Sequence, residues 1–178
     1  MDMKEKCLSR QEIFNGHIVN LRVDEVELPN GQKGRREVVR HGAAVAIVAL
    51  DEEQNIIMVR QYRYATEQLM LEIPAGLIEA DEDPLAAAQR ELEEETGLRA
   101  HVWEELSRFY SSPGFCDELI YLYLATDLYL GQSNPDEDEF IESARFPLSF
   151  ARQMMQLSEL HDSKTIIGIA LTALRDSG

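Results

Sequence analysis

The sequence has few cysteines, few positive charges and no long apolar run. Its two cysteines, Cys7 and Cys116, are too few for a disulfide framework or a four-ligand metal site, and such low usage is typical of a reducing cytoplasm. The longest uninterrupted apolar run, residues 43–50, is far shorter than the roughly 20 residues of a membrane helix. The first residues lack the apolar segment of a secretory signal. We therefore expect a cytoplasmic protein with no membrane partner.

The shortage of positive charge makes the chain strongly acidic. Among 178 residues, 17 are Lys or Arg and 33 are Asp or Glu, so the formal net charge is −16. A chain with this charge is repelled by nucleic acid, which we exclude as a partner. The acids are concentrated, with eight in residues 79–95 and five in residues 136–142. Carboxylates at this density repel one another unless a cation lies among them.

Alternating and apolar segments predict an α+β fold in two parts. Val19, Leu21 and Val23 alternate with polar residues, and a Pro-Asn-Gly turn separates them from a second strand at 34–39. We expect residues 1–41 to form an antiparallel β-arm or small sheet, and residues 42–178 to form the main domain. There the patterns predict strands at 43–50, 56–60, 69–73, 102–110, 118–125 and 140–146, and helices at 148–157 and 163–174. Pro74, Ala75 and Gly76 are expected to stop the third of these strands.

One further helix carries a cluster of carboxylates. Asp83 is a good N-cap, and Gly97 is a typical left-handed residue just after a helix. The spacing i, i+3, i+4 of Glu91, Glu94 and Glu95 places them on one helical face. A solvated face is the alternative interpretation, but Arg90 is the only cation in residues 76–98. Hard oxygen ligands without counter-cations favour a site for Mg²⁺ or Mn²⁺.

Residues 76–98 resemble the signature of the Nudix hydrolase family. That signature is Gly, five residues, Glu, seven residues, Arg-Glu, an aliphatic, any residue, Glu-Glu, any residue, Gly and an aliphatic. Every fixed position is met here, at Gly76, Glu82, Arg90, Glu91, Leu92, Glu94, Glu95, Gly97 and Leu98. The resemblance implies an α/β/α sandwich with a mixed sheet. It also implies metal-dependent hydrolysis of a nucleoside diphosphate linked to another moiety.

The same resemblance assigns roles to the residues of the motif. It implies that Glu91, Glu94, Glu95 and the backbone carbonyl of Ala75 hold Mg²⁺ or Mn²⁺. Arg90 belongs to the catalytic group as the partner that orients the helix carboxylates, and Glu82 holds the loop before the helix. Glu93 is expected to point away from this site into solvent. A late acidic loop implies a general base, and both Glu137 and Glu139 are candidates for it.

Flanking residues indicate the substrate. Pro113, fifteen positions after Leu98, and the sequence that runs from Glu72 into Gly76 resemble the ADP-ribose pyrophosphatase subgroup. The resemblance therefore implies hydrolysis of ADP-ribose to AMP and ribose 5-phosphate. Pyrophosphatases of other nucleoside diphosphate sugars share much of this pattern and remain an alternative. A Nudix-type sensor that binds ADP-ribose without cleaving it is an alternative from another class.

The resemblance also implies how the substrate is bound. The residues that match the subgroup's substrate contacts are Arg36, Glu37, Arg63, Leu77, Ser112, Pro113, Gly114 and Glu118. In the family, the pair that Arg36 and Glu37 match comes from the partner subunit. Two strands alone are marginal in water and need a surface to cover them. We therefore expect a homodimer in which residues 1–41 reach the neighbouring chain.

Overall fold

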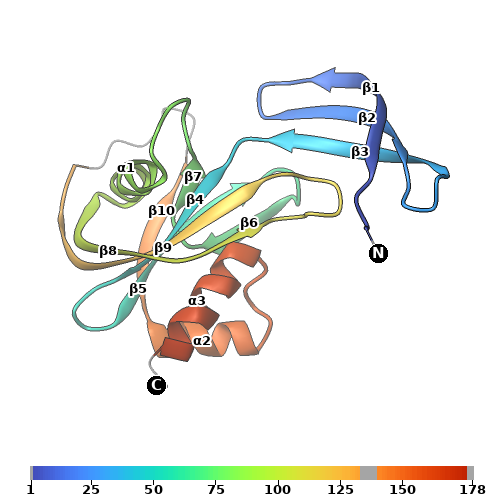
Figure 1. The fold of residues 1–178 in the computed structure, drawn as a ribbon. Helices are drawn as coiled ribbons and strands as arrows, with labels where there is room; N and C mark the ends of the chain where they lie inside the picture. Colours follow the sequence, from blue (N-terminus) through green and yellow to red (C-terminus); the bar gives the residue numbers. More distant parts are fainter. Residues whose placement is uncertain (1, 133–139, 176–178) are drawn as a thin grey trace. The chain divides into compact units, whose positions relative to one another are not determined.

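The structure is a computed structural model that describes residues 2–132 and 140–175 (Figure 1). The chain divides into two compact units. The first unit comprises Met1–Ala43 and Phe109–Leu119, and the second comprises Ala44–Arg108 and Ile120–Gly178. Each unit contains its own sheet. No helix in the described part of the chain is both long and apolar enough to cross a membrane.

The first unit is built on a three-stranded antiparallel sheet. Its strands are β1 (Lys6–Asn15), β2 (Val19–Glu27) and β3 (Lys33–His41), in that order. The two expected strands are confirmed as β2 and β3, and β1 adds a third strand that pairs with β2. Residues 115–117 join the end of β3: the Val39 N–H donates to the Phe115 carbonyl at 2.7 Å, and Val39 forms a parallel bridge with Cys116.

The second unit contains a mixed sheet of seven strands. Its main order is β10-β5-β4-β9-β8, with β6 paired to β5 and β7 paired to β4. Strands β4 and β9 are parallel, whereas β5, β6, β7 and β10 form antiparallel pairs. The bounds are β4 (Ala44–Leu50), β5 (Asn55–Arg63), β6 (Gln68–Glu72), β7 (Ala75–Leu77), β8 (Leu98–Tyr110), β9 (Leu119–Leu130) and β10 (Glu142–Pro147).

Three helices cover the two faces of this sheet: α1 (Pro84–Thr96), α2 (Leu148–Gln156) and α3 (Ser163–Arg175). Alternate residues of a strand point to opposite faces. Ile47 of β4 packs in one buried cluster with Leu92 of α1, and its neighbour Val48 lies against Gly168 of α3. Figure 1 accordingly shows α1 on one side of the sheet and α2 with α3 on the other. The expected α/β/α sandwich is confirmed.

The short strand β7 is the main departure from the expected elements. The expected stop is confirmed, because β6 ends at Glu72, but Ala75–Leu77 then form a further strand that pairs with β4. Pro74 lacks an N–H but still accepts a hydrogen bond from Ile47 N at 2.9 Å. A strand of three residues is too short to show an alternating pattern, so the sequence carries no signal for it. Its pairing places Ala75 and Gly76 beside α1.

Gly168 provides a test of how closely α3 packs on the sheet. A Cβ atom at this position would lie 2.7 Å from Cγ2 of Val48, which is fully buried. We predict that Gly168→Ala lowers the free energy of unfolding by about 1–3 kcal/mol, although alanine is the better helix former by about 1 kcal/mol. Urea unfolding measures this change. Gly114→Ala is the control, because a Cβ there meets nothing within 4 Å. Equal stability of the two variants would contradict the prediction.

Candidate active site

Helix α1 is fixed at both ends by the expected caps. The Asp83 carboxylate accepts hydrogen bonds from the N–H groups of Leu85 at 2.9 Å and Ala86 at 3.4 Å. Gly97 has a φ of 69°, and its N–H donates to the Glu93 carbonyl at 2.8 Å. The caps determine where the helix begins and ends, and therefore which side chains face the sheet.

Arg90 is the hub of the carboxylate cluster. Its Nη1 donates to Glu91 at 2.7 Å and to Glu94 at 2.9 Å, and the second of these is an i, i+4 ion pair along the helix. Its Nε and Nη2 each lie 3.0 Å from an oxygen of Glu82, and Nη2 also donates to the Leu77 carbonyl at 3.0 Å. The hydrogen bonds with Glu82 and the charge of Glu91 raise the pKa of Arg90 above its ordinary value. Arg90 thus holds three carboxylates in fixed directions.

Strand β7 lies directly against the carboxylates of α1. The Ala75 N–H donates to the Glu95 carboxylate at 3.2 Å. The Glu91 carboxylate occupies the space beside Gly76 where a Cβ would stand, 2.0–2.2 Å from that position. Only glycine permits this approach. Glu91 and Glu95 are 9% and 8% exposed, so these two acids lie in the seam between helix and strand rather than in open solvent.

The donor set of this seam suits a hard divalent cation. The carboxylates of Glu91, Glu94 and Glu95 and the carbonyl of Ala75 would supply oxygen ligands only. Among residues 2–132 and 140–175, no group of three or more His, Cys, Asp or Glu side chains is arranged as a ready metal site. Hydrogen bonds hold all three carboxylates, since Arg90 donates to Glu91 and Glu94, and the Ala75 N–H donates to Glu95. The residues fit the metal by chemistry and by proximity to β7.

Arg63, whose side chain is 41% exposed, pairs with a buried acid, a contact that the sequence did not reveal. Its Nε and Nη2 each donate to the Glu72 carboxylate at 2.8 Å, and Lys164 of α3 donates to the same carboxylate. Glu72 is 1% exposed. Burial raises the pKa of Glu72, but the Arg63 hydrogen bonds and the charge of Lys164 outweigh it and lower the pKa to about 2. In the sequence, Glu72 is an acidic residue at the end of a strand, followed by Ile73 and Pro74, and this pattern does not predict a buried ion pair.

Six of the expected substrate-binding residues belong to the first unit: Arg36, Glu37, Ser112, Pro113, Gly114 and Glu118. Arg36 and Glu37 are consecutive in β3, so they point to opposite faces of that sheet. The Arg36 guanidinium pairs with Glu5, with Nε at 2.9 Å from Oε2. Glu118 lies 3.6 Å from Nδ1 of His41, and its carbonyl accepts from Ser111 N at 3.1 Å. Arg63 and Leu77 belong to the second unit.

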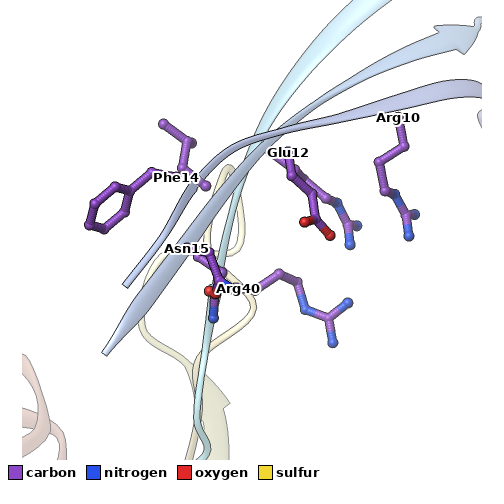
Figure 2. A pocket seen from close by; sticks show the side chains of 8 residues that line it. Arg10, Glu12, Phe14, Asn15 and Arg40 are labelled. Carbon is purple, nitrogen blue, oxygen red and sulfur yellow. The ribbon is translucent and has the colours of Figure 1, made fainter. Parts of the chain in front are cut away.

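A groove of about 340 Å³ crosses one face of the first unit's sheet. Figure 2 shows Arg10, Glu12 and Arg40 on the same side, with Phe14 pointing away from them. Asp24 lies 3.2 Å from both Arg10 and Arg22, and Asp117 pairs with Arg40 at 2.5 Å. The three arginines are therefore balanced by Asp24, Asp117 and Glu12. Among the charged residues that line the groove, three are arginines and one is Glu12, while Asp24 and Asp117 pair with the arginines without lining it.

Two expectations concern residues outside the cluster. Glu93 was expected only in solvent, which is wrong: it pairs with Arg99 at 2.7 Å and accepts a hydrogen bond from Gln132 N at 2.9 Å. Gln132 lies 39 residues after Glu93 in the sequence, so helical spacing could not predict this contact. Glu137 and Glu139, the candidates for the general base, lie outside the described residues.

Two family descriptions match the chain. The NUDIX domain matches residues 40–165, and the nucleoside diphosphate sugar hydrolase N-terminal domain matches residues 5–39.

Individual proteins match almost the full length. The chain is 45% identical to the methanol dehydrogenase activator of Bacillus methanolicus, over 98% of this chain and 95% of that protein. It is 41% identical to the ADP-ribose pyrophosphatase of Bacillus subtilis (strain 168), over 98% and 96%. A crystal structure of an ADP compounds hydrolase superimposes with a TM-score of 0.88 at 25% identity, covering 98% of this chain and 96% of that one.

The buried Glu72 pair predicts a specific acid sensitivity. In the folded protein the pKa of Glu72 is about 2, below the ordinary value of 4.5. The stabilisation that ionised Glu72 gives the folded state is therefore complete above about pH 4.5 and is lost as the pH falls toward 2. We predict that Glu72→Gln lowers the free energy of unfolding at pH 7 by about 3 kcal/mol, a loss that shrinks as the pH falls through this window. Urea unfolding at pH 7, 4 and 2.5 measures it.

The matched control for this prediction is Glu104→Gln. Glu104 also forms a two-pronged pair with an arginine, Arg175, with both distances at 2.6 Å, but this pair is exposed. Exposed pairs contribute little, so the control should unfold close to the wild-type midpoint at every pH. A Glu72→Gln variant with the pH profile of the wild type would contradict the assignment of this acid sensitivity to Glu72.

Proposed function

The chain belongs to the NUDIX domain family, and from this premise we propose that it is a pyrophosphatase that hydrolyses ADP-ribose to AMP and ribose 5-phosphate. The observation that carries the proposal is the seam in which the carboxylates of α1 meet Ala75 and Gly76 of β7. It offers several oxygen ligands for a divalent cation beside one arginine, and a metal-dependent hydrolase requires such ligands. The choice of ADP-ribose is supported by the 41% identity to the Bacillus subtilis enzyme.

The reaction requires a water molecule and a base. The water oxygen bonds to one phosphorus, the bridging P–O bond breaks, and the bridging oxygen leaves with the other phosphate. A divalent cation held by the carboxylates of α1 and the Ala75 carbonyl would neutralise charge on the diphosphate and lower the pKa of water. Glu137 or Glu139 takes the proton, and Arg90 with Glu82 keeps the helix carboxylates in place.

Divalent-cation dependence is general in this family, and we propose Mg²⁺, with Mn²⁺ as a substitute. Glu91, Glu94, Glu95 and the Ala75 carbonyl would hold it. We propose that Arg63, whose guanidinium direction is set by Glu72, binds a phosphate. Leu77, Ser112, Pro113, Gly114 and Glu118 would line the remaining substrate contacts. The two cysteines are free thiols, which supports a cytoplasmic location.

A substrate panel tests the proposed activity. The purified full chain is incubated with Mg²⁺ and ADP-ribose, ADP-glucose, GDP-mannose or UDP-glucose, and products are separated by anion-exchange chromatography. We expect the highest kcat/KM with ADP-ribose, and equal amounts of AMP and ribose 5-phosphate. A higher kcat/KM with another sugar nucleotide would replace ADP-ribose by that alternative. Calorimetric binding of ADP-ribose with no product would identify a sensor instead.

Glu95→Gln tests the metal ligands. The substitution removes one ligand charge but keeps the side chain's shape, so we predict a kcat at least about a hundredfold lower with an unchanged far-UV circular dichroism spectrum. Glu93→Gln on the opposite side of α1 is the matched control and should stay within a few-fold of wild type. Wild-type turnover by Glu95→Gln at saturating Mg²⁺ would remove Glu95 from the site.

The base is tested by Glu137→Gln and Glu139→Gln. We predict that one variant loses about a hundredfold or more in kcat while it retains metal affinity, and that the other changes little. Kinetics over a Mg²⁺ titration separate the two effects. If neither variant loses more than a few-fold, the proton acceptor is another group.

We also propose a homodimer in which residues 1–41 serve as the dimerisation segment and residues 42–178 as the hydrolase domain. Exposed apolar side chains on and after β1 support this: Leu8, Ile13, Phe14, Ile18 and Val19 are 37–57% exposed. So many apolar groups on one short sheet are typical of a surface that another chain covers. The net charge of −16 opposes association, so the interface must be largely apolar.

Ile13→Glu in the full chain tests this assembly. A buried, unpaired carboxylate at an apolar interface is costly, so we predict that the variant sediments as a monomer while the wild type sediments as a dimer. Leu174→Glu is the control, since Leu174 is also apolar and 70% exposed but lies at the end of α3. A monomeric wild type would refute the dimer.

A further inference from the structure

Residues 73–76, which lead into the carboxylate seam, are held by atoms from three other elements. Ile47 N of β4 donates to the Pro74 carbonyl at 2.9 Å, and the Ala75 N–H donates to Glu95 of α1. The Ile73 N–H donates to the Thr165 hydroxyl of α3 at 2.9 Å. The first two contacts come from the neighbouring strand and from the proposed metal site itself. The third comes from a helix on the opposite face of the sheet.

The Thr165 hydroxyl is oriented by its own hydrogen bond. Asp162, the residue before α3, accepts from the Thr165 N–H at 2.9 Å and from the Thr165 hydroxyl at 2.5 Å. Because that hydroxyl donates its only proton to Asp162, its lone pairs are left to accept the Ile73 N–H. Thr165 and Ile73 are both 0% exposed, so water cannot replace this acceptor.

The same turn of α3 holds the neighbouring residue of β6. Lys164 donates to Glu72, and its Nζ also lies 3.0 Å from Asp162. Two successive residues, Glu72 through its side chain and Ile73 through its backbone, are therefore tied to the first turn of α3. A displacement of this turn would be passed along the chain to Ala75 and Gly76, which contact Glu95 and Glu91.

We propose that Thr165, oriented by Asp162, is a positioning residue that sets β7 at the distance from α1 that metal binding requires. The proposal rests on the proposed metal-dependent function, but it assigns a role to a helix that contributes no ligand. Without the hydroxyl, the Ile73 N–H is buried with no acceptor, and residues 73–75 shift to find one. The distance between the backbone of Ala75 and the carboxylates of α1 then changes.

The experiment compares three full-chain variants. Thr165→Val removes the hydroxyl but keeps the shape of the side chain, and Thr165→Ser restores a hydroxyl. Thr172→Val is the matched control, because Thr172 is also on α3, is 3% exposed, and its hydroxyl donates only to the Gly168 carbonyl of its own helix at 2.8 Å. Free Mn²⁺ is titrated by electron paramagnetic resonance without substrate. Then kcat and KM for ADP-ribose are measured over a range of Mn²⁺ concentrations.

We expect Thr165→Val to bind Mn²⁺ about tenfold or more weakly, within the range seen when partners behind metal ligands are removed. Its kcat should fall at low Mn²⁺ and largely recover at saturating Mn²⁺, with KM unchanged. Thr165→Ser should approach wild-type affinity. Thr172→Val should lower the unfolding midpoint without changing Mn²⁺ affinity. This recovery by metal distinguishes positioning from a general loss of stability.

Wild-type Mn²⁺ affinity in Thr165→Val, or an equal loss in Thr172→Val, would overturn the inference. If Thr165→Val does not fold, Lys164→Met replaces it, since it cuts one of the two ties and leaves Glu72 paired with Arg63. That variant must then bind Mn²⁺ more weakly than wild type, or the inference fails. A wild type that binds no Mn²⁺ also overturns it. A wild type that binds Mn²⁺ but leaves ADP-ribose intact refutes only the proposed substrate.

Discussion

Repulsion among the carboxylates of α1 is the constraint on which the rest of the site depends. Glu91, Glu94 and Glu95 stand on one face of one helical turn, in a chain whose net charge is already −16. Each like-charged i, i+4 pair costs an isolated helix about 0.2–0.5 kcal/mol, and burial makes it worse. Arg90 offsets this by donating to Glu91 and Glu94 at once, while the backbone of Ala75 donates to Glu95. The helix therefore needs β7 beside it.

The layered fold supplies β7 at the required place. Strand β4 is buried along its whole length because α1 covers one of its faces and α3 the other. Strand β7 pairs with the start of β4 and lies against α1, where the Ala75 N–H donates to Glu95. The helices differ in what they contribute: α1 brings the acids, and α3 brings Thr165 and Lys164, which hold the chain entering β7. The backbone that leads into β7 is thus held by packing against α3 and also contacts the carboxylates of α1.

For the residues that match the family's substrate contacts, the resemblance predicts which residues are used but not how each side chain is oriented. Two nitrogens of Arg63 donate to Glu72, which restricts the directions in which this guanidinium can contact another group. Arg36 and Glu37 match a substrate-contacting pair of the family. Because they are consecutive strand residues, their side chains face opposite sides of the sheet, so a ligand on one side of the sheet cannot contact both in the same way. The NUDIX match establishes the family, whereas the use of each residue follows from its local geometry.

The sequence alone determined the carboxylate helix, its caps and most strands, because helical spacing, capping and alternation act over a few residues. It also determined the family, since the signature from Gly76 to Leu98 is continuous. Only the tertiary structure decided the short strand β7 and the hydrogen bond from Ile73 to Thr165, which joins residues 92 positions apart. It alone decided the buried pairing of Glu72 as well. Such contacts leave no periodic pattern, because each depends on how the chain brings distant segments to the two faces of one sheet.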